Sequence, residues 1–568
     1  MLYGFRARNL PLKIKDMSVL GKKWKVLNKA PKGVVEKMLE NRGLMDPDDL
    51  ARFIKPDFVK GFHDPFLFTG MDKIVERIEK AIKSGERIIV YGDYDVDGIS
   101  GAAIVFLTLE HLGGKVSYRL PHRLNDGYGI NEKYLDEFET AGVKLVITVD
   151  CGISNAREIT IAKQKGIDVI ITDHHNIPEN YPHDAYEVLH PMRKDSKYPF
   201  KELTGAGVAF KLAQALLKED AFAYSLLDLA SLGTVADCGP IVGENRLIVK
   251  RGLELLPQTK WEGLKFLQEL AGVDFGKPLN THTIGFQIAP RINAAGRIDS
   301  PYFALQLLIN NQEPGKSKQL ANQLEKLNKK RQNMLSNALE EAENRFRSHQ
   351  NSSIIIEYDK NWHVGIIGLV AGRLSEKYSK PAIILQNFDT YLVASARSLE
   401  YFNIIEALTK HADLLDHYGG HAQAAGFNIP KANLKKFITS INEYAAKKLK
   451  TCDIAPQLSI ECEIAPEEAS WSTFEFIKSL EPFGVGNDRP KFLLKKVQVE
   501  NSRTVGKEDK HLSVSFNING KNVNGIGFNL GSFVDYTRQH RSLDIVFQLE
   551  ENEWKGNKSL QMKLVDFK

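Results

Sequence analysis

Cysteine is scarce in this sequence. Its 568 residues include four cysteines, and no two of them form a Cys-x-x-Cys pair. This scarcity excludes a disulfide-stapled scaffold and leaves no zinc-ribbon pattern, so a reduced environment is the simplest expectation. Long apolar runs are also lacking, and the first residues have no apolar core of signal-peptide length. We therefore expect a cytoplasmic protein that does not engage a membrane.

A strong charge imbalance is lacking as well. Lysine and arginine total 76 against 71 aspartates and glutamates, which gives a net charge of +5. So small an excess is weak evidence for a nucleic-acid partner when it stands alone. No repeats and no low-complexity tract interrupt the chain. Its length exceeds what one hydrophobic core usually serves, and three to four domains are expected.

The apolar pattern predicts an α/β protein with a β-barrel at its end. Short Val/Ile-rich runs alternate with helical stretches in the first half, as in parallel strands joined by helices. Leucines at helical spacing then predict one long amphipathic linker helix, although a helical hairpin would fit them too. Five short strands near the end fit a barrel of the OB type. The predicted parts are a lead-in (1–60), a catalytic domain (61–315), the linker helix (316–350), a second α/β domain (351–452) and the barrel (453–568).

Three aspartates follow the first predicted strand. The sequence GDYDVDG at 92–98 places them two residues apart, so they can face the same way in an extended chain. Carboxylates gathered on one side repel each other unless cations neutralise them. Mg²⁺ and Mn²⁺ prefer such oxygen ligands. A calcium loop or a solvated turn would contain the same residues.

Similar polar residues follow three further apolar runs. Asp150 comes after residues 145–149, the sequence DHH at 173–175 comes after 169–172, and Asp237 comes after 232–236. If all four runs are strands of one parallel sheet, their carboxyl ends meet at one edge. Two metal ions held there about 3.5–4 Å apart could clamp a phosphodiester and ready a water for in-line attack. A histidine off the metals could donate to a phosphate oxygen.

These motifs, in this order, resemble the DHH/DHHA1 phosphoesterase family. The flanking sequences LTGAGVAFKL (203–212) and APRINAAGR (289–297) are similar to its branch that degrades single-stranded DNA. Further on, ASARS (394–398) and YGGHAQAAGF (418–427) resemble the companion DHHA1 domain. The resemblance runs from about residue 60 to the end of the chain.

The resemblance implies roles for particular residues. Six would ligate two Mn²⁺ or Mg²⁺ ions, with Asp150 bridging them: Asp93, Asp95, Asp97, Asp150, His174 and Asp237. His175 would contact the scissile phosphate, and Arg297 would neutralise it. Substrate binding would fall to Arg123, Arg397, Ser398, Gly420 and His421. Asp173 is expected to orient a histidine. His190, which stands where an asparagine is expected, is not expected to be a ligand.

The expected activity is hydrolysis of single-stranded DNA from one end, 5′ to 3′ by resemblance, in recombination and repair. A helicase and a single-strand-binding protein are expected partners, and the protein is expected to be a monomer. Two alternatives stay open: a phosphoesterase for short oligonucleotides or cyclic dinucleotides, and a non-catalytic DNA-binding relative. The barrel and the long linker helix favour a polymeric substrate over the first. The complete acidic and histidine set favours an enzyme over the second.

Overall fold

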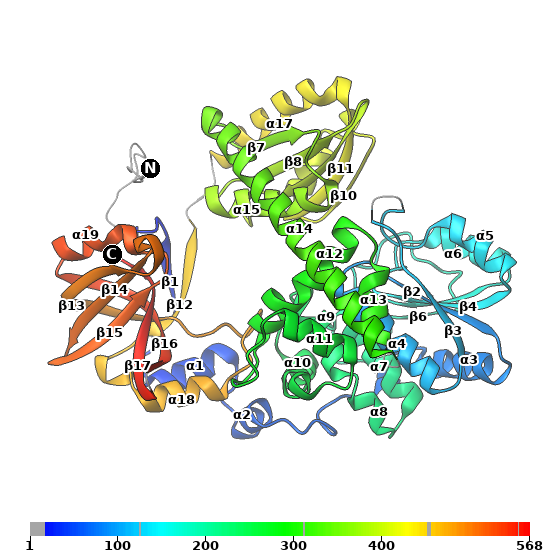
Figure 1. Cartoon of the computed structure of the whole chain (residues 1–568), viewed down its shortest axis with the longest axis horizontal. Coiled ribbons are helices and arrows are strands. Elements are labelled where there is room, and N and C mark those ends of the chain that lie inside the picture. The colour runs from blue at the N-terminus through cyan, green and yellow to red at the C-terminus, as the bar shows by residue number, and fades with distance from the viewer. Residues whose placement is uncertain (1–16, 124–125, 311–312, 451–455, 555) are drawn as a thin grey trace. The chain divides into compact units, whose positions relative to one another are not determined.

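The chain folds into two compact units in a computed structural model (Figure 1). The structure describes residues 17–568 except 124–125, 311–312, 451–455 and 555. The larger unit contains residues 58–453 and 484–486, and the smaller unit contains the described part of 1–57 with 454–483 and 487–568. Among the described residues, no helix is long and apolar enough to cross a membrane.

The larger unit begins with a five-stranded parallel sheet of order β3-β2-β4-β5-β6. Its strands are β2 (Arg87–Gly92), β3 (Lys115–Arg119), β4 (Val143–Val149), β5 (Asp168–Thr172) and β6 (Glu187–Leu189). The chain moves from β2 outward to β3 and then returns to the other side of β2 as β4. The strand order therefore reverses between β2 and β4, which is the point where open α/β sheets place their ligands.

Alternate residues of these strands enter two separate cores. Val90 and Ile147 pack on one face against α3 (Met71–Lys83), α4 (Val96–His111) and α7 (Gly205–Leu217). Tyr91 and Val146 pack on the other face against α5 (Glu132–Thr140) and α6 (Ala156–Gln164). Burial on both faces explains why the strands read as continuous apolar runs. The predicted parallel sheet is confirmed.

The fourth apolar run is not a strand. Residues 232–236 lie in helix α9 (Leu227–Ala236), whose first eight residues are all buried. A short apolar run cannot be assigned to strand or helix by periodicity when the element is buried all round. Asp237 therefore reaches the site from the end of a helix rather than from the edge of the sheet.

The rest of this domain is helical. After α8 (Ala221–Tyr224) and α9 come α10 (Gly243–Leu255), α11 (Glu262–Leu270), the π-helical segment η4 (Thr283–Ile288), α12 (Ala289–Ile298) and α13 (Tyr302–Ile309). The single helix α14 (Pro314–Phe346) then joins this domain to the next, so one long helix is present rather than a hairpin.

The second α/β domain has a mixed sheet of order β10-β11-β9-β8-β7. β7 (Ile355–Asp359) and β8 (Ala382–Asn387) are parallel, and β9 (Tyr391–Arg397), β11 (Ala424–Pro430) and β10 (His417–Gly420) continue the sheet antiparallel. Its helices are α15 (Val364–Tyr378), α16 (Ile404–Thr409) and α17 (Leu434–Leu449).

The smaller unit is built on the predicted barrel. Its strands β13 (Phe492–Val505), β14 (His511–Ile518), β15 (Lys521–Gly527), β17 (Asn557–Phe567) and β16 (Ser542–Trp554) close through pairing of β13 with β16. Near the N-terminus, β1 (Lys23–Asn28) pairs in parallel with β12 (Gln457–Glu463), which extends the sheet. Helices α1 (Val34–Arg42), α2 (Pro47–Ile54), α18 (Trp471–Ser479) and α19 (Val534–Gln539) complete the unit. The buried ion pair of Arg42 with Glu461, 2.9 Å apart, fastens α1 to β12.

Candidate metal centre

Two carboxylates lie at the point where the strand order reverses. Asp93 follows β2 and Asp150 follows β4, and only 4% and 2% of these residues are exposed. The backbone of Asp150 is left-handed, with φ of 61°, a conformation that aspartate adopts more readily than most residues. Gly205 packs directly on it, because a Cβ atom at that position would lie 2.6 Å from the Asp150 carboxylate.

The other two aspartates of the GDYDVDG sequence lie at the start of α4. Asp95 caps the helix by accepting hydrogen bonds from the N–H groups of Asp97 and Gly98. Asp97 accepts hydrogen bonds from the N–H groups of Gly205 (2.6 Å) and Ala206 (2.9 Å) at the start of α7. Two helix N-termini thus orient carboxylates toward the same place.

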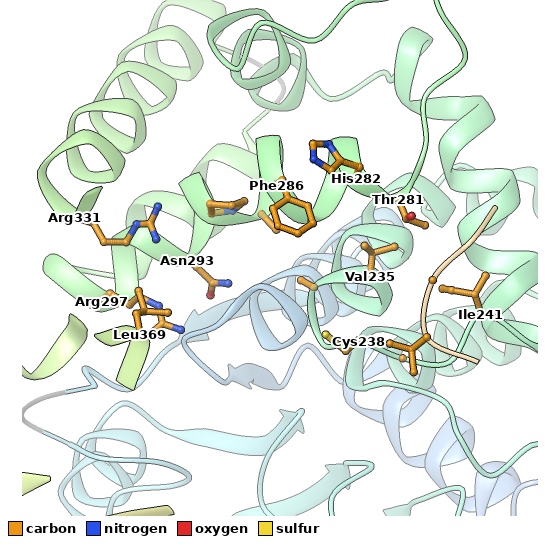
Figure 2. A pocket seen from close by; sticks show the side chains of 17 residues that line it. Val235, Cys238, Ile241, Thr281, His282, Phe286, Asn293, Arg297, Arg331 and Leu369 are labelled. Atoms are coloured by element: carbon orange, nitrogen blue, oxygen red, sulfur yellow. The ribbon is translucent and has the colours of Figure 1, made fainter. Parts of the chain in front are cut away.

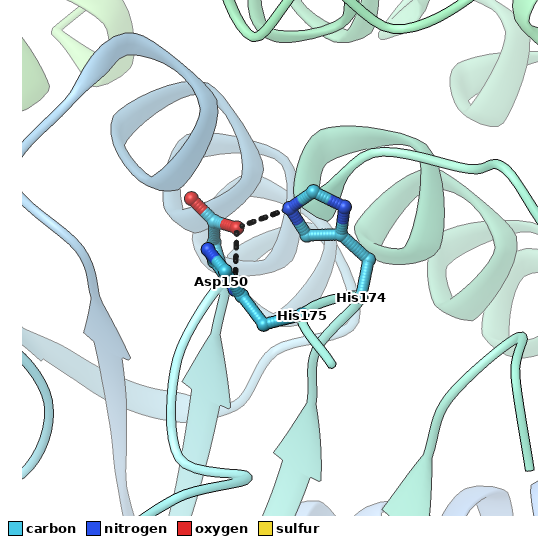
Figure 3. A group of neighbouring side chains, drawn as sticks. All are labelled: Asp150, His174 and His175. Atoms are coloured by element: carbon cyan, nitrogen blue, oxygen red, sulfur yellow. Dashed lines mark ion pairs between the residues drawn. The ribbon is translucent and has the colours of Figure 1, made fainter. Parts of the chain in front are cut away.

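The DHH triplet supplies the imidazoles. Nε2 of His174 lies 3.0 Å from Oδ1 of Asp150 and 3.7 Å from carboxylate oxygens of both Asp97 and Asp237. Nδ1 of His175 lies 3.8 Å from the same Asp150 oxygen (Figure 3). Asp150 is therefore the common neighbour of both rings.

Asp173 contacts the two histidines that follow it in the triplet. One of its oxygens accepts hydrogen bonds from the backbone N–H groups of His174 and His175 and lies 2.8 Å from Nδ1 of His175. His190 is buried, with its Nε2 2.7 Å from the His175 carbonyl oxygen and its Nδ1 accepting from the Met192 N–H. Both ring nitrogens of His190 are thus engaged by backbone groups, which agrees with a non-ligand role.

The carboxylates are costly to ionise in this arrangement. Burial, followed by repulsion from neighbouring carboxylates, raises the pKa of Asp93, Asp97 and Asp150 well above the usual range. Burial and the charge of Asp95 raise the pKa of Asp237 to about 6. One buried oxygen of Asp93 has no hydrogen-bond partner among the described residues, and Oδ1 of Asp150 forms no hydrogen bond of acceptable geometry there, although both imidazoles lie near it. Cations would satisfy both the unpaired oxygens and the repulsion.

The ligand atoms fall into three groups that share members. The groups are Asp93 with Asp95 and Asp150, Asp97 with His174 and Asp237, and Asp150 with His174 and His175, and the atoms of each lie within 4.8 Å of one another. Burial and the neighbouring His175 lower the pKa of His174 to about 4, which keeps its ring neutral, as a metal ligand must be. This oxygen-rich set with an imidazole suits Mn²⁺ or Mg²⁺.

His175 has the opposite electrostatic setting. Burial lowers its pKa, but the hydrogen bond to Asp173 and the charge of that carboxylate outweigh burial and raise the pKa to about 9. Tyr128, a residue not singled out in the sequence, also contacts this ring. Its hydroxyl donates to the backbone oxygen of Asp150 (3.1 Å) and lies 3.1 Å from Nδ1 of His175. The sequence signal for Tyr128 is its position between two glycines, Gly127 and Gly129.

Arginines gather beside the cluster. Arg297 lies in the last turn of α12 and donates to the Gly365 carbonyl oxygen of the second α/β domain. Burial and the nearby charges of Arg123 and Arg331 lower its pKa. Burial and Arg123 likewise lower the pKa of Arg397, at the end of β9. Guanidinium groups that lie this close together favour the binding of an anion between them.

The remaining predicted substrate-binding residues lie at the same end of the mixed sheet as Arg397. Arg397 is opposite Ala424, and Gly420 is opposite Ala425 on the next strand. Gly420 has a left-handed φ of 142°, and a Cβ atom there would lie 2.4 Å from the Ala424 carbonyl oxygen, so glycine is required. The Ser398 hydroxyl donates to the Phe402 carbonyl oxygen, and His421 is exposed.

Fold and site together define a DHH-type phosphoesterase with a companion domain and a C-terminal OB-type barrel. Three family descriptions match the chain in this order: the DHH family N-terminal domain at residues 87–234, the DHHA1 domain at 351–447 and the RecJ OB domain at 460–566.

Relatives that match nearly the full length of this chain identify the family within the DHH-type phosphoesterases. The single-stranded-DNA-specific exonuclease RecJ of Bacillus subtilis is 36% identical over 94% of this chain and 67% of its own length. RecJ of Escherichia coli is 31% identical over 93% of this chain and 94% of its own. The structure of RecJ from Thermus thermophilus in complex with Mn²⁺ superposes with a TM-score of 0.83 at 30% identity, over 97% of this chain and 80% of that one. The chain belongs to the RecJ family.

Proposed function

We propose that the protein is a metal-dependent exonuclease that hydrolyses phosphodiester bonds of single-stranded DNA and releases mononucleotides. The observation that carries this proposal is the convergence of seven side chains, from four separate segments of the chain, into three overlapping ligand groups at the switch point of the sheet. The names of the full-length relatives, single-stranded-DNA-specific exonucleases, supply the substrate class.

Six side chains would hold the metal ions: Asp93, Asp95, Asp97, Asp150, His174 and Asp237. Asp150 belongs to two of the three ligand groups, which suits a bridging ligand. A T. thermophilus relative has been solved with Mn²⁺ and with Mg²⁺. When bound, a pair of such ions lowers the pKa of a coordinated water and neutralises charge on the phosphate.

His175 and Arg297 would act on the phosphate itself. Because Nδ1 of His175 is engaged by Asp173 at 2.8 Å, its Nε2 is the nitrogen left to donate to a phosphate oxygen. The Arg297 guanidinium adds positive charge beside the site and is positioned from both domains of the larger unit through its bond to Gly365. Donors fixed before the reaction stabilise developing negative charge without reorganisation.

Arg123, Arg397, Ser398, Gly420 and His421 would hold the end of the strand. The mutual repulsion of Arg123, Arg297 and Arg397 is relieved by an anion, and a terminal 5′-phosphate provides one. Polarity from 5′ to 3′ is therefore part of the proposal. We also propose that the protein is a cytoplasmic monomer and that it acts in recombination and repair. Its proposed partners are a helicase and a single-strand-binding protein.

The test is digestion of 5′-phosphorylated strands that carry a label at either end. With Mn²⁺, a 3′ label should stay on progressively shorter products while a 5′ label leaves as a mononucleotide. Blunt duplex and circular single strands should persist, and EDTA should stop the reaction. Cutting of the circle would reveal an endonuclease, and turnover in EDTA would remove the metal from the proposal.

A variant pair ties this activity to the cluster. Asp150→Ala should lower turnover at least 1000-fold, because it removes the carboxylate shared by two ligand groups. Asp195→Ala is the matched control, since this exposed aspartate of the same domain pairs with Arg193 instead. Equal activity of both variants would contradict the assignment of Asp150.

A further inference from the structure

A pocket of about 390 Å³ opens next to the metal centre. The π-helical segment η4 and α12 form one of its sides, and the turn after Asp237 forms another (Figure 2). Arg297 lines it, whereas neither Arg123 nor Arg397 does. The pocket therefore shares Arg297 with the proposed cleavage site but does not include the two arginines proposed to hold the strand terminus.

An exposed aromatic pair stands in this pocket. Phe286 is 72% exposed, more than any other large apolar side chain in the described part of the chain. Its ring stacks on that of His282, with ring centroids 4.6 Å apart and planes inclined by 19°. Exposing a phenylalanine forfeits hydrophobic stabilisation, and the exposed ring beside the site is available to stack on a ligand.

The backbone under this pair is unusual. Phe286 lies in a π-helical segment that runs directly into α12, the helix that carries Arg297. Short π-helical stretches are rare and occur frequently at functional sites. Arg297 follows Phe286 by eleven positions, which at the helical rise per residue corresponds to about 16 Å along the axis.

The charge of the pocket complements a nucleic-acid strand. No carboxylate is among its described lining residues, while Arg297 and Arg331 are. The Nε group of Arg331 is buried without a hydrogen-bond partner among the described residues. Burial and the neighbouring Arg373 and Arg291 lower the pKa of Arg331. An anion beside Arg331 would offset the cost of burying its charge and its repulsion from these arginines.

We infer that Phe286, with His282 behind it, is a stacking platform for a nucleobase on the 3′ side of the scissile phosphate, and that Arg331 pairs with a backbone phosphate. This inference rests on the proposed function and adds the path of the strand beyond the cut. Stacking on an aromatic face is tolerant of sequence, because every base has a π-face. The platform would hold the strand in register for successive cuts without reading its bases.

Binding of a fluorescent 5′-phosphorylated oligothymidylate, measured by anisotropy in EDTA so that no strand is cut, tests the platform. Phe286→Ala should weaken binding about tenfold, and Phe286→Trp should retain it. Phe66→Ala is the matched control, since Phe66 is 47% exposed in the same unit and does not line the pocket. Wild-type affinity of the Phe286→Ala variant would overturn the inference.

Oligonucleotides with one abasic site at successive positions locate the contact. The wild type should lose affinity at one internal position, and Phe286→Ala should be insensitive to that same position. A plot of log affinity against log salt has a negative slope. Arg331→Gln should reduce the magnitude of this slope by about 0.7, the value for one phosphate of a single strand. Undiminished abasic sensitivity in Phe286→Ala would also overturn the platform. If the wild type showed no metal-dependent digestion, the proposed function would be refuted instead. The binding measurements do not depend on digestion, so the two failures are distinguishable.

Discussion

Gly205 shows how a single residue can control the metal centre without ligating anything. Its N–H holds Asp97, and its Cα packs on Asp150, so that a methyl group would overlap the carboxylate. Gly205→Ala must displace Asp150, and a shift of about 1 Å at a reacting centre can cost 100-fold in rate. We expect turnover about 100-fold lower and a higher Mn²⁺ concentration for half-maximal rate, measured by titrating the metal in the digestion assay.

Gly315→Ala is the control for this variant. Gly315 lies in the first turn of α14, and a Cβ atom there would meet nothing within 4 Å. Its activity should be unchanged and its stability equal or slightly higher, since alanine restricts the unfolded chain. If Gly205→Ala retained wild-type metal dependence, the close packing of α7 on Asp150 would have no functional role.

Lys211 belongs to a motif that resembles the family but lies within the core. Its Nζ is 3.1 Å from a carboxylate oxygen of Glu244 and donates to the His63 carbonyl oxygen at 2.6 Å, and both charged side chains are almost fully buried. Lys211→Met should destabilise the larger unit by about 3–5 kcal/mol, because Glu244 would remain buried without its cation. Chemical denaturation measures the loss. Adding Glu244→Gln to Lys211→Met should recover part of the lost unfolding free energy. If the double variant lost as much as the two single variants together, this pairing would be contradicted.

At the scale of the element, what could be predicted depended on how each element is buried. β2, β4 and β5 are buried on both faces, so each is a continuous apolar run in the sequence. These runs predict the strands and place the acidic residues at their ends. Helix α9 carries the same kind of run, so its sequence predicts a strand, because a helix buried all round has no amphipathic pattern. The side chain of Asp237 still reaches the cluster, since convergence depends on tertiary packing rather than on element type.

Helix α9 also carries a buried carboxyl whose ionisation should affect stability. Asp228 accepts hydrogen bonds from the Leu229 N–H, from Nε1 of Trp261 (2.9 Å) and from the Thr259 hydroxyl (2.5 Å). Burial outweighs these bonds and raises its pKa to about 6. Because the folded-state pKa lies above the unfolded one, the folded state binds the proton more tightly. The contribution of Asp228 is therefore fully present below about pH 4 and is lost as the pH rises through 6.

Asp228→Asn removes this titration while an amide can still meet all three partners. The loss in the wild type corresponds to about 3 kcal/mol for a shift of two pKa units. The unfolding free energy of the variant, minus that of the wild type, should thus rise by up to about 3 kcal/mol between pH 4 and pH 7. Denaturation curves across this range measure the difference, in which the other titrating groups cancel. A difference independent of pH would show that Asp228 titrates normally.

At the scale of the whole molecule, the order of domains could be predicted, but the position of the N-terminal segment could not. Each domain has a local signature: strand-length runs with acidic ends, a long leucine-spaced helix, and short strands between polar turns. The pairing of β1 with β12 joins residues more than 400 positions apart, and β1 alternates only weakly between buried and exposed positions. The ion pair of Arg42 with Glu461 is equally remote in sequence. Contacts of that separation leave no periodic signal within either segment.

The division into two units makes the effect of metal on stability local. Ions that bind only the folded cluster should stabilise the larger unit, because they offset the repulsion among carboxylates that the fold gathers. At a metal concentration 100 times the dissociation constant, the gain is about 2.7 kcal/mol, which slows exchange through global opening of that unit about 100-fold. Hydrogen exchange followed by mass spectrometry should show this slowing in peptides from β2, β4 and the start of α4. Peptides from the barrel strands β13–β17 should exchange at the same rate with and without Mn²⁺. In the Asp150→Ala variant this protection by Mn²⁺ should be lost or strongly reduced. If Mn²⁺ protected the barrel peptides as much as those of the larger unit, the two units would unfold together.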